Sequence, residues 1–267
     1  MLRISHHCRA IFRILALSLA TALFYLLWII VSPLLLTSVS ASYAWRNFNF
    51  RRWAKVTAVI MGMKILVKGT QPQSPFFLVA NHLSYVDILA FASQVDCLFV
   101  AKHEVARWPI LGRLGRSMET IFVDRTLRKD VLRVNDIVES ALAEGKAVLL
   151  FPEGTSSAGN SVLPFHSALL EPAVRASYPV SYAAVSYRTP PDQAPASMSV
   201  CWWGDMTFLS HFYQLLRLRT FDAHVVFGSH SIRADDRKTL AKRLRQAIQE
   251  EFGYRGMIEE QCKTTTR

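Results

Sequence analysis

The stretch that organises this chain reads Asn81-His82-Leu83-Ser84-Tyr85-Val86-Asp87, and it joins a strand-like apolar run at 76–80 to a helical apolar run at 88–91. Ser84 and Asp87 fit the spacing of a capping box, which predicts Ser84 as the N-cap of a helix and Asp87 as its third residue. His82 then lies in the loop before the helix. Within one ideal helix the side chains of His82 and Asp87 would point about 140° apart, so the loop position is what allows them to meet.

A contact between His82 and Asp87 predicts general-base chemistry. A carboxylate that accepts one imidazole N–H fixes the tautomer and leaves the other nitrogen free to take a proton from a hydroxyl. The alternative interpretation is structural, with Asp87 as a helix-capping residue and His82 as an ordinary loop histidine. The spacing alone leaves both open.

Length and composition narrow the classes of protein. A chain of 267 residues suits one substantial core with an appendage, so we expect a single catalytic domain. The net charge of +11 indicates an anionic partner, and the positive mean hydropathy of +0.19 favours a membrane surface over nucleic acid. The four cysteines show no C-x-x-C spacing and predict neither a zinc site nor a disulfide framework, which favours a reducing, cytoplasm-facing location.

The N-terminal region is of membrane length, because residues 14–45 carry no charge. Its apolar run is too long for a cleavable signal peptide. Basic residues flank it on both sides and Pro33 lies inside it, so a hairpin that enters one leaflet and returns is the alternative to a spanning helix. The aromatic and basic segment at 48–63 predicts an interfacial helix.

Beyond this anchor, short apolar strands alternate with helical runs, which predicts an α/β domain with a mixed, largely parallel sheet flanked by helices. The expected strands are 65–69, 76–80, 97–101, 120–123, 147–151, 180–187, 199–203 and 224–227. The expected helices are 104–115, 128–143, 167–176, 206–217 and 235–251. The expected organisation is an anchor with an interfacial helix at 1–60, a catalytic domain at 61–255 and a tail at 256–267.

Two further segments carry candidate chemistry at strand ends, where open α/β sheets bind ligands. The loop Phe151-Pro152-Glu153-Gly154-Thr155 follows one apolar strand, and its glycine would let backbone N–H groups approach an anion; an ordinary turn is the alternative. Arg125 ends another strand and suits a phosphate or carboxylate, or else a structural ion pair with Asp124 or Glu153. Lys102 is either a contact to an anionic substrate or a surface lysine.

Other motifs are missing from the sequence. His103-Glu104 does not open an H-E-x-x-H helix, and no G-x-S-x-G nucleophile elbow occurs. Basic residues do not alternate with aromatic ones at strand spacing, so we expect no nucleic-acid partner.

Taken in order, four blocks resemble the glycerolipid acyltransferase family that includes the lysophosphatidic acid acyltransferases. The residues from His82 to Asp87 resemble its His-x4-Asp motif. The later blocks are Lys102 to Arg125, Phe151 to Thr155, and Tyr178-Pro179-Val180 with the strand that follows. Together with the first block, the resemblance covers about residues 62–190.

This resemblance implies that His82, oriented by Asp87, is the general base for a lysolipid hydroxyl that attacks the thioester of acyl-CoA or acyl carrier protein directly. It implies no covalent enzyme intermediate and no cofactor or metal. From the uncharged N-terminal run we expect a membrane location with the lipid bilayer as a partner, and from the cysteine pattern a catalytic domain that faces the cytoplasm. The substrate-binding residues that we expect are Asn81, Ser84, Lys102, Arg125, Glu153, Gly154 and Thr155.

The chain departs from the family pattern at two points. Ser156 stands where an arginine is common, and His166-Ser167 stands where a basic residue and glycine are common. One phosphate-pairing charge is therefore missing. We expect 1-acylglycerol-3-phosphate as the acceptor, with another lysolipid such as lyso-ornithine lipid as the alternative. A non-catalytic lipid-binding relative is the second class of protein, and the intact His82 and Asp87 favour the enzyme.

Overall fold

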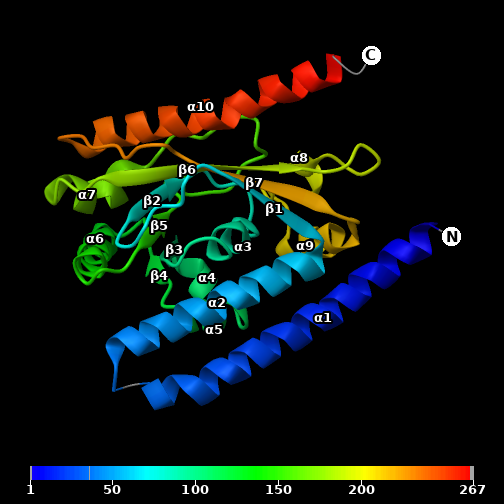
Figure 1. The fold of residues 1–267 in the computed structure, drawn as a ribbon, viewed down its shortest axis with the longest axis horizontal. Helices are drawn as coiled ribbons and strands as arrows, with labels where there is room; N and C mark the ends of the chain where they lie inside the picture. Colours follow the sequence, from blue (N-terminus) through cyan, green and yellow to red (C-terminus); the bar gives the residue numbers. More distant parts are fainter. Residues whose placement is uncertain (1, 36, 265–267) are drawn as a thin grey trace.

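Seven strands form the central sheet of the computed structural model, which describes residues 2–35 and 37–264 (Figure 1). Their order is β1-β7-β6-β2-β5-β3-β4, and every neighbouring pair is parallel except β6 with β7. The bounds are β1 (Met63–Lys68), β2 (Phe77–Ala80), β3 (Leu98–Lys102), β4 (Ile121–Val123), β5 (Val148–Leu150), β6 (Val180–Arg188) and β7 (Phe221–Phe227). The predicted mixed, largely parallel sheet is confirmed.

Helices cover both faces of this sheet, and the strands β2 and β5 are apolar and buried at every position. Phe77 and Val79 of β2 pack toward one layer of helices, and Leu78 and Ala80 toward the other. The first layer contains α6 (Arg128–Ala143), α7 (Glu171–Arg175) and α10 (Arg237–Thr264), with the short helix η2 (Ser167–Leu170) before α7. The second contains α1 (Leu2–Val31), α2 (Val39–Met61), α3 (Asp87–Ala92) and α9 (Phe208–Arg217).

Several expected elements differ from the structure. The helix expected at 167–176 is the 3-10 helix η2 followed by α7, and the helix expected at 235–251 is α10, which continues to Thr264 into the expected tail. The segment 199–203 is not a strand: α8 (Ala196–Ser199) precedes it, and the Trp202 N–H donates to the Leu83 carbonyl (2.9 Å) instead of a sheet neighbour. The helix expected at 104–115 is divided into α4 (His103–Ala106) and α5 (Leu111–Ser117). Pro109 accounts for the break, since proline disfavours helical geometry in the residue before it.

The N-terminal helices α1 and α2 form a hairpin, joined through η1 (Ser32–Leu35), and they lie side by side (Figure 1). Among the described residues, His6–Leu35 is the helical segment long and apolar enough to cross a membrane. The interfacial helix expected at 48–63 is the second half of α2. It ends at Gly62 in a left-handed conformation (φ 77°), and Ala54, Ala58 and Met61 join the core of the domain.

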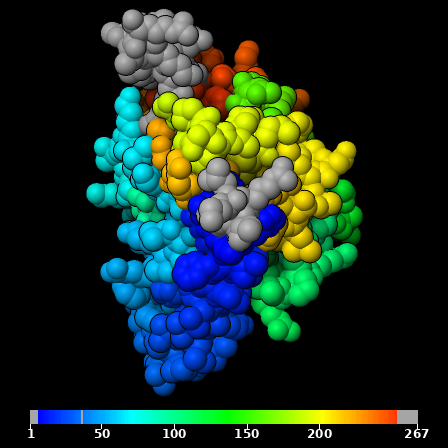
Figure 2. All heavy atoms as spheres, turned by 90° about the vertical axis from the view of Figure 1, so that its right-hand side faces the viewer, coloured from blue at the N-terminus to red at the C-terminus, as the bar shows by residue number. Residues whose placement is uncertain are grey.

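Buried arginines fix both helices of the hairpin to the domain. The Arg13 guanidinium donates to three carbonyls at the end of α9, those of Leu216 (3.2 Å), Leu218 (2.6 Å) and Arg219 (3.0 Å). These carbonyls lack partners within the helix, and a cation there also complements the helix dipole. Arg46 of α2 similarly donates to the Met118 carbonyl (2.6 Å). The hairpin is therefore packed on the domain while its far end projects beyond it (Figure 2).

Candidate active site

His82 and Asp87 are in contact at the carboxyl end of β2. The His82 Nδ1 and Asp87 Oδ2 atoms are 2.7 Å apart. An ionised carboxylate can only accept, so Nδ1 carries the proton and Nε2 is left as a free base. Asp87 has no exposed side-chain surface, whereas the His82 side chain is 23% exposed. The pair thus has a buried acceptor and a reachable base.

Asp87 also fixes the loop that carries His82. Its Oδ2 atom accepts the backbone N–H groups of Leu83 (2.7 Å) and Ser84 (3.1 Å). The predicted N-cap at Ser84 is wrong, since α3 begins at Asp87 after Val86, and the Ser84 hydroxyl is buried without a hydrogen-bond partner in the described structure. The carboxylate, placed at the first helical residue, bonds the loop N–H groups in place of a serine cap.

Phe151 holds the His82 ring from the next strand. The two rings stack with centroids 4.5 Å apart and an angle of 20° between their planes. His82 follows β2 and Phe151 follows β5, which pair in parallel. Their side chains therefore meet where the carboxyl ends of neighbouring strands lie, the position at which open α/β sheets bind ligands.

Glu153 supports the loop that carries His82 with both carboxylate oxygens. Its Oε1 accepts the His82 N–H (2.8 Å) and its Oε2 accepts the Leu163 N–H (3.1 Å). Burial raises the pKa of Glu153 to about 7, while these backbone hydrogen bonds act in the opposite direction. Glu153 was expected to bind substrate, and the structure shows both of its oxygens bonded to backbone N–H groups, one of them that of His82.

Asn81 has a similar bridging position between strands. Its Nδ2 donates to the Val185 carbonyl (2.9 Å), and its Oδ1 accepts the Val185 N–H (2.7 Å). The residue is buried, with 1% of its surface exposed. The amide expected to bind substrate therefore ties the end of β2 to β6.

Tyr187 is a site residue that the sequence did not reveal. Its hydroxyl donates to Asp87 Oδ1, the oxygen that His82 does not use. It lies near the carboxyl end of β6, and β6 pairs in parallel with β2. That location at a strand end was the available signal, but the neighbouring strand could be identified only from the sheet order.

Arg125 and Gly154 lie next to each other, as expected, and His166 lies beside them. Gly154 has a φ of 76°, and a Cβ atom there would collide with Arg125 Nη1 and lie 3.0 Å from His166 Cδ2. In the described structure no ion pair links Arg125 to Asp124 or Glu153, and its buried Nε has no hydrogen-bond partner. The guanidinium is therefore available to an anionic ligand.

The other predicted residues lie in different surroundings. Lys102 is 60% exposed and pairs with Glu104 (3.1 Å). Thr155 is exposed, with its hydroxyl 3.5 Å from the Ser156 carbonyl. The Ser156 hydroxyl donates to the Trp202 carbonyl. The structure thus gives Lys102 and Thr155 solvent-exposed positions and turns the Ser156 hydroxyl toward a neighbouring loop.

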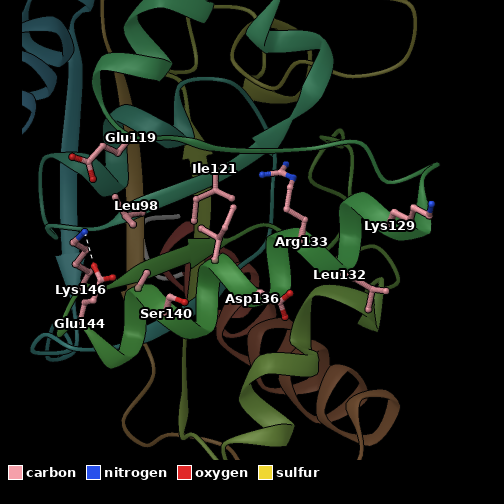
Figure 3. A pocket seen from close by; sticks show the side chains of 12 residues that line it. Leu98, Glu119, Ile121, Lys129, Leu132, Arg133, Asp136, Ser140, Glu144 and Lys146 are labelled. Atoms are coloured by element: carbon pink, nitrogen blue, oxygen red, sulfur yellow. Dashed lines mark ion pairs between the residues drawn. The ribbon is translucent and has the colours of Figure 1, made fainter.

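A hollow of about 710 Å³ lies away from this site, between α6 and the strands β3 and β4 (Figure 3). Leu98 and Ile121, which line it, are the first residues of their strands. His82 lies two residues beyond the last residue of β2, and these strands all run in one direction. The hollow is thus at the opposite end of the sheet from His82.

The chain is similar to known proteins over most of its length. A family model described as Acyltransferase matches residues 64–186. The chain is 32% identical over 244 residues to the lyso-ornithine lipid O-acyltransferase of Rhizobium meliloti, covering 82% of this chain and 83% of that protein. It is 28% identical to the 1-acyl-sn-glycerol-3-phosphate acyltransferase of Neisseria gonorrhoeae, covering 72% and 75%.

A solved structure shares the fold. The crystal structure of the 1-acyl-sn-glycerophosphate acyltransferase from Thermotoga maritima superposes with a TM-score of 0.71, covering 95% of this chain and 97% of that one. The two sequences are 16% identical. The likeness extends over the hairpin as well as the sheet, since it covers nearly all of both chains.

The raised pKa of Glu153 predicts a pH-dependent stability. Because the pKa of Glu153 in the folded state, about 7, exceeds the ordinary glutamate value of 4.5, the folded state binds more protons between these pH values and loses stability as the pH rises through them. The Glu153→Gln variant lacks this titration. We therefore expect the difference in unfolding free energy, variant minus parent, to rise between about pH 4.5 and 7. Denaturant unfolding across this range measures it, and a difference independent of pH would contradict the prediction.

Proposed function

This chain belongs to the acyltransferase family, and on that premise we propose that His82 is the general base with which it transfers a fatty acyl group to the hydroxyl of a lysolipid. It is an acyltransferase, and its curated relatives act on lysolipids. The observation that carries the proposal is the 2.7 Å contact between His82 Nδ1 and the buried Asp87, which leaves Nε2 as a reachable base.

The proposed reaction needs one base and one thioester donor, acyl-CoA or acyl carrier protein. His82 Nε2 takes the hydroxyl proton while the oxygen attacks the thioester carbonyl. The C–S bond then breaks, and the thiolate takes the proton back from the imidazolium. Asp87 remains ionised throughout and stabilises the imidazolium through Nδ1. A positioned base of this kind contributes about 100- to 10,000-fold in rate.

We propose that Arg125 binds the headgroup of the lysolipid acceptor. Its guanidinium forms no ion pair within the described residues and lies against Gly154, next to the residue that bonds the His82 N–H. A single arginine beside Ser156 supplies less positive charge than a phosphate monoester prefers. We therefore keep 1-acylglycerol-3-phosphate and lyso-ornithine lipid as two candidate acceptors, and the second is favoured by the missing cation.

We further propose that the hairpin enters one leaflet of a bilayer without crossing it. Large apolar side chains are exposed along much of α1, including Phe12 (69%), Leu19 (63%) and Leu23 (52%). The same helix buries Arg13 and Leu17 against the rest of the molecule. A helix attached on one side presents its other side to lipid. This geometry supports lateral immersion over a spanning orientation.

Replacement of the base tests the proposed reaction. His82→Ala should lower acyl transfer at least 100-fold, while the protein stays folded, because the ring is partly exposed and its loss removes little core volume. Asp87→Asn should lower activity as well, since the amide presents the wrong group to Nδ1. Transfer of radiolabelled acyl-CoA to a panel of lysolipids, with thermal unfolding as the folding control, measures both. Parental turnover in folded His82→Ala would remove His82 from the mechanism.

Substitutions at Arg125 and Ser156 test which lysolipid headgroup the enzyme prefers. Arg125→Ala should lower kcat/KM for 1-acylglycerol-3-phosphate by about 10- to 150-fold, the equivalent of a charge-assisted hydrogen bond of about 1.5 to 3 kcal/mol. The loss should be smaller for lyso-ornithine lipid, and Ser156→Arg should shift preference toward the phosphate monoester. Lys129→Ala on α6 is the control, since Lys129 lines the distant hollow. Equal ratios of the two acceptors in every protein would exclude headgroup recognition at these positions.

Substitution of exposed leucines on α1 tests whether this helix attaches the protein to a membrane. The double variant Leu19→Asp with Leu23→Asp should lose most of its binding to lipid vesicles in a flotation assay, because each buried leucine contributes roughly 1.5 to 3 kcal/mol. Leu209→Asp is the matched control: this leucine is 78% exposed but lies on α9. A double variant that floats as the parent does would show that α1 does not enter the lipid.

A further inference from the structure

We propose that Tyr187 is a positioning residue of the acyl transfer reaction, whose hydroxyl holds the Asp87 carboxylate and disperses its charge, so that His82 returns to the free base readily. This inference rests on the proposed function, because it assigns a role to the partner of the proposed base. Tyr187 acts through Asp87 and is not itself placed at the reacting atoms.

The hydrogen bonds of Asp87 are divided unequally between its two oxygens. Oδ2 accepts from the His82 ring and from two backbone N–H groups, those of Leu83 and Ser84. Oδ1 accepts from the Tyr187 hydroxyl, its partner within the described residues. Removal of the phenol would therefore leave one oxygen of a fully buried carboxylate without a donor.

The Tyr187 hydroxyl is well suited to donate permanently. Burial, followed by the charge of Asp87, raises the pKa of Tyr187 well above its ordinary value, so the phenol keeps its proton. Its ring lies edge-on to Phe221 of β7, with centroids 6.2 Å apart. Strand β6 and this contact fix the ring, and the ring in turn fixes the carboxylate.

The phenol should weaken the attraction between Asp87 and the imidazolium. A hydrogen bond to Oδ1 disperses the negative charge, so the carboxylate holds the imidazolium less strongly and His82 gives up its proton more readily. Without it, the less dispersed charge would stabilise the imidazolium, and His82 would keep its proton to a higher pH. The free base would then be scarcer at neutral pH.

Other titratable groups lie close to His82, Asp87 and Tyr187, and their titration must be distinguished from that of His82. Glu153 bonds the His82 N–H from the loop after β5, and its pKa of about 7 lies in the relevant range. Burial raises the pKa of Cys201 to about 12 and raises that of Tyr85 further, so these two do not titrate near neutrality. A pH–rate profile alone would not distinguish the titration of His82 from that of Glu153. The titration of the histidine is therefore measured directly.

The test compares Tyr187→Phe with Tyr178→Phe in the full-length protein in detergent. Tyr178 donates to the Pro75 carbonyl (2.9 Å), away from Asp87, so its variant loses a hydrogen bond of similar kind. Carbon-13 NMR of labelled histidine, with the His82 signal assigned by its absence in His82→Gln, follows the titration. The midpoint should rise by roughly 0.5 to 1 pH unit in Tyr187→Phe and stay unchanged in Tyr178→Phe. In Tyr187→Phe, kcat at pH 7 should fall several-fold with KM unchanged.

The outcomes separate this inference from the proposed function. If His82→Ala is inactive but folded Tyr187→Phe keeps the parental midpoint and kcat, the role of Tyr187 is refuted and the base assignment stands. If His82→Ala is fully active, the proposed function fails first. Should Tyr187→Phe not fold, site-specific 3,5-difluorotyrosine at 187 keeps the shape and strengthens the donor. The midpoint should then fall, and an unchanged midpoint overturns the inference.

Discussion

A buried carboxylate is costly unless donors surround it, and the Asp87 charge governs this site for that reason. The desolvation of such an ion costs several kcal/mol. Asp87 is fully buried, and its donors come from the loop after β2 and from β6. These strands are adjacent and parallel, so their carboxyl ends meet. One charge therefore fixes the imidazole, the loop and the end of a strand together.

Two more buried polar residues extend this constraint across the sheet. Glu153 connects the loop after β5 to the His82 backbone, and Asn81 connects the end of β2 to β6. Both bond backbone groups, so the loop geometry does not depend on flexible side-chain pairs. A site supported in this way holds the His82 imidazole in place before a ligand arrives, which is the geometric requirement of preorganised catalysis. Among the residues expected at the substrate, Arg125 is the cation that this framework leaves free of ion pairs in the described structure.

Much of the fold was predictable because apolar strands alternate with amphipathic helices, and strand-end residues such as His82 and Arg125 follow from that pattern. The His82 contact to Asp87 was predictable from a local motif of six residues. Tyr187 was not, because it reaches Asp87 from 100 positions away and depends on the order of strands in the sheet. The error at 199–203 has a similar cause, since Trp202 bonds the distant Leu83 carbonyl. Ser84 is not the cap, because the Asp87 N–H donates to the Ser84 backbone carbonyl (3.1 Å) and not to the serine hydroxyl, which has no partner in the described structure.

Because of the Arg13 contact, the N-terminal hairpin cannot easily be transferred from one protein of this fold to another. Its guanidinium needs the carbonyls at the end of α9, and Gly62 must lack a side chain because a Cβ there would collide with Arg13 and lie 2.7 Å from the Arg219 carbonyl. Residues near positions 13, 62 and 219 must therefore change together. In a lineage that recombines domains, this hairpin would be inherited with its own sheet, and a chimera that respects only the helix boundaries would leave either a buried cation or three carbonyls without partners.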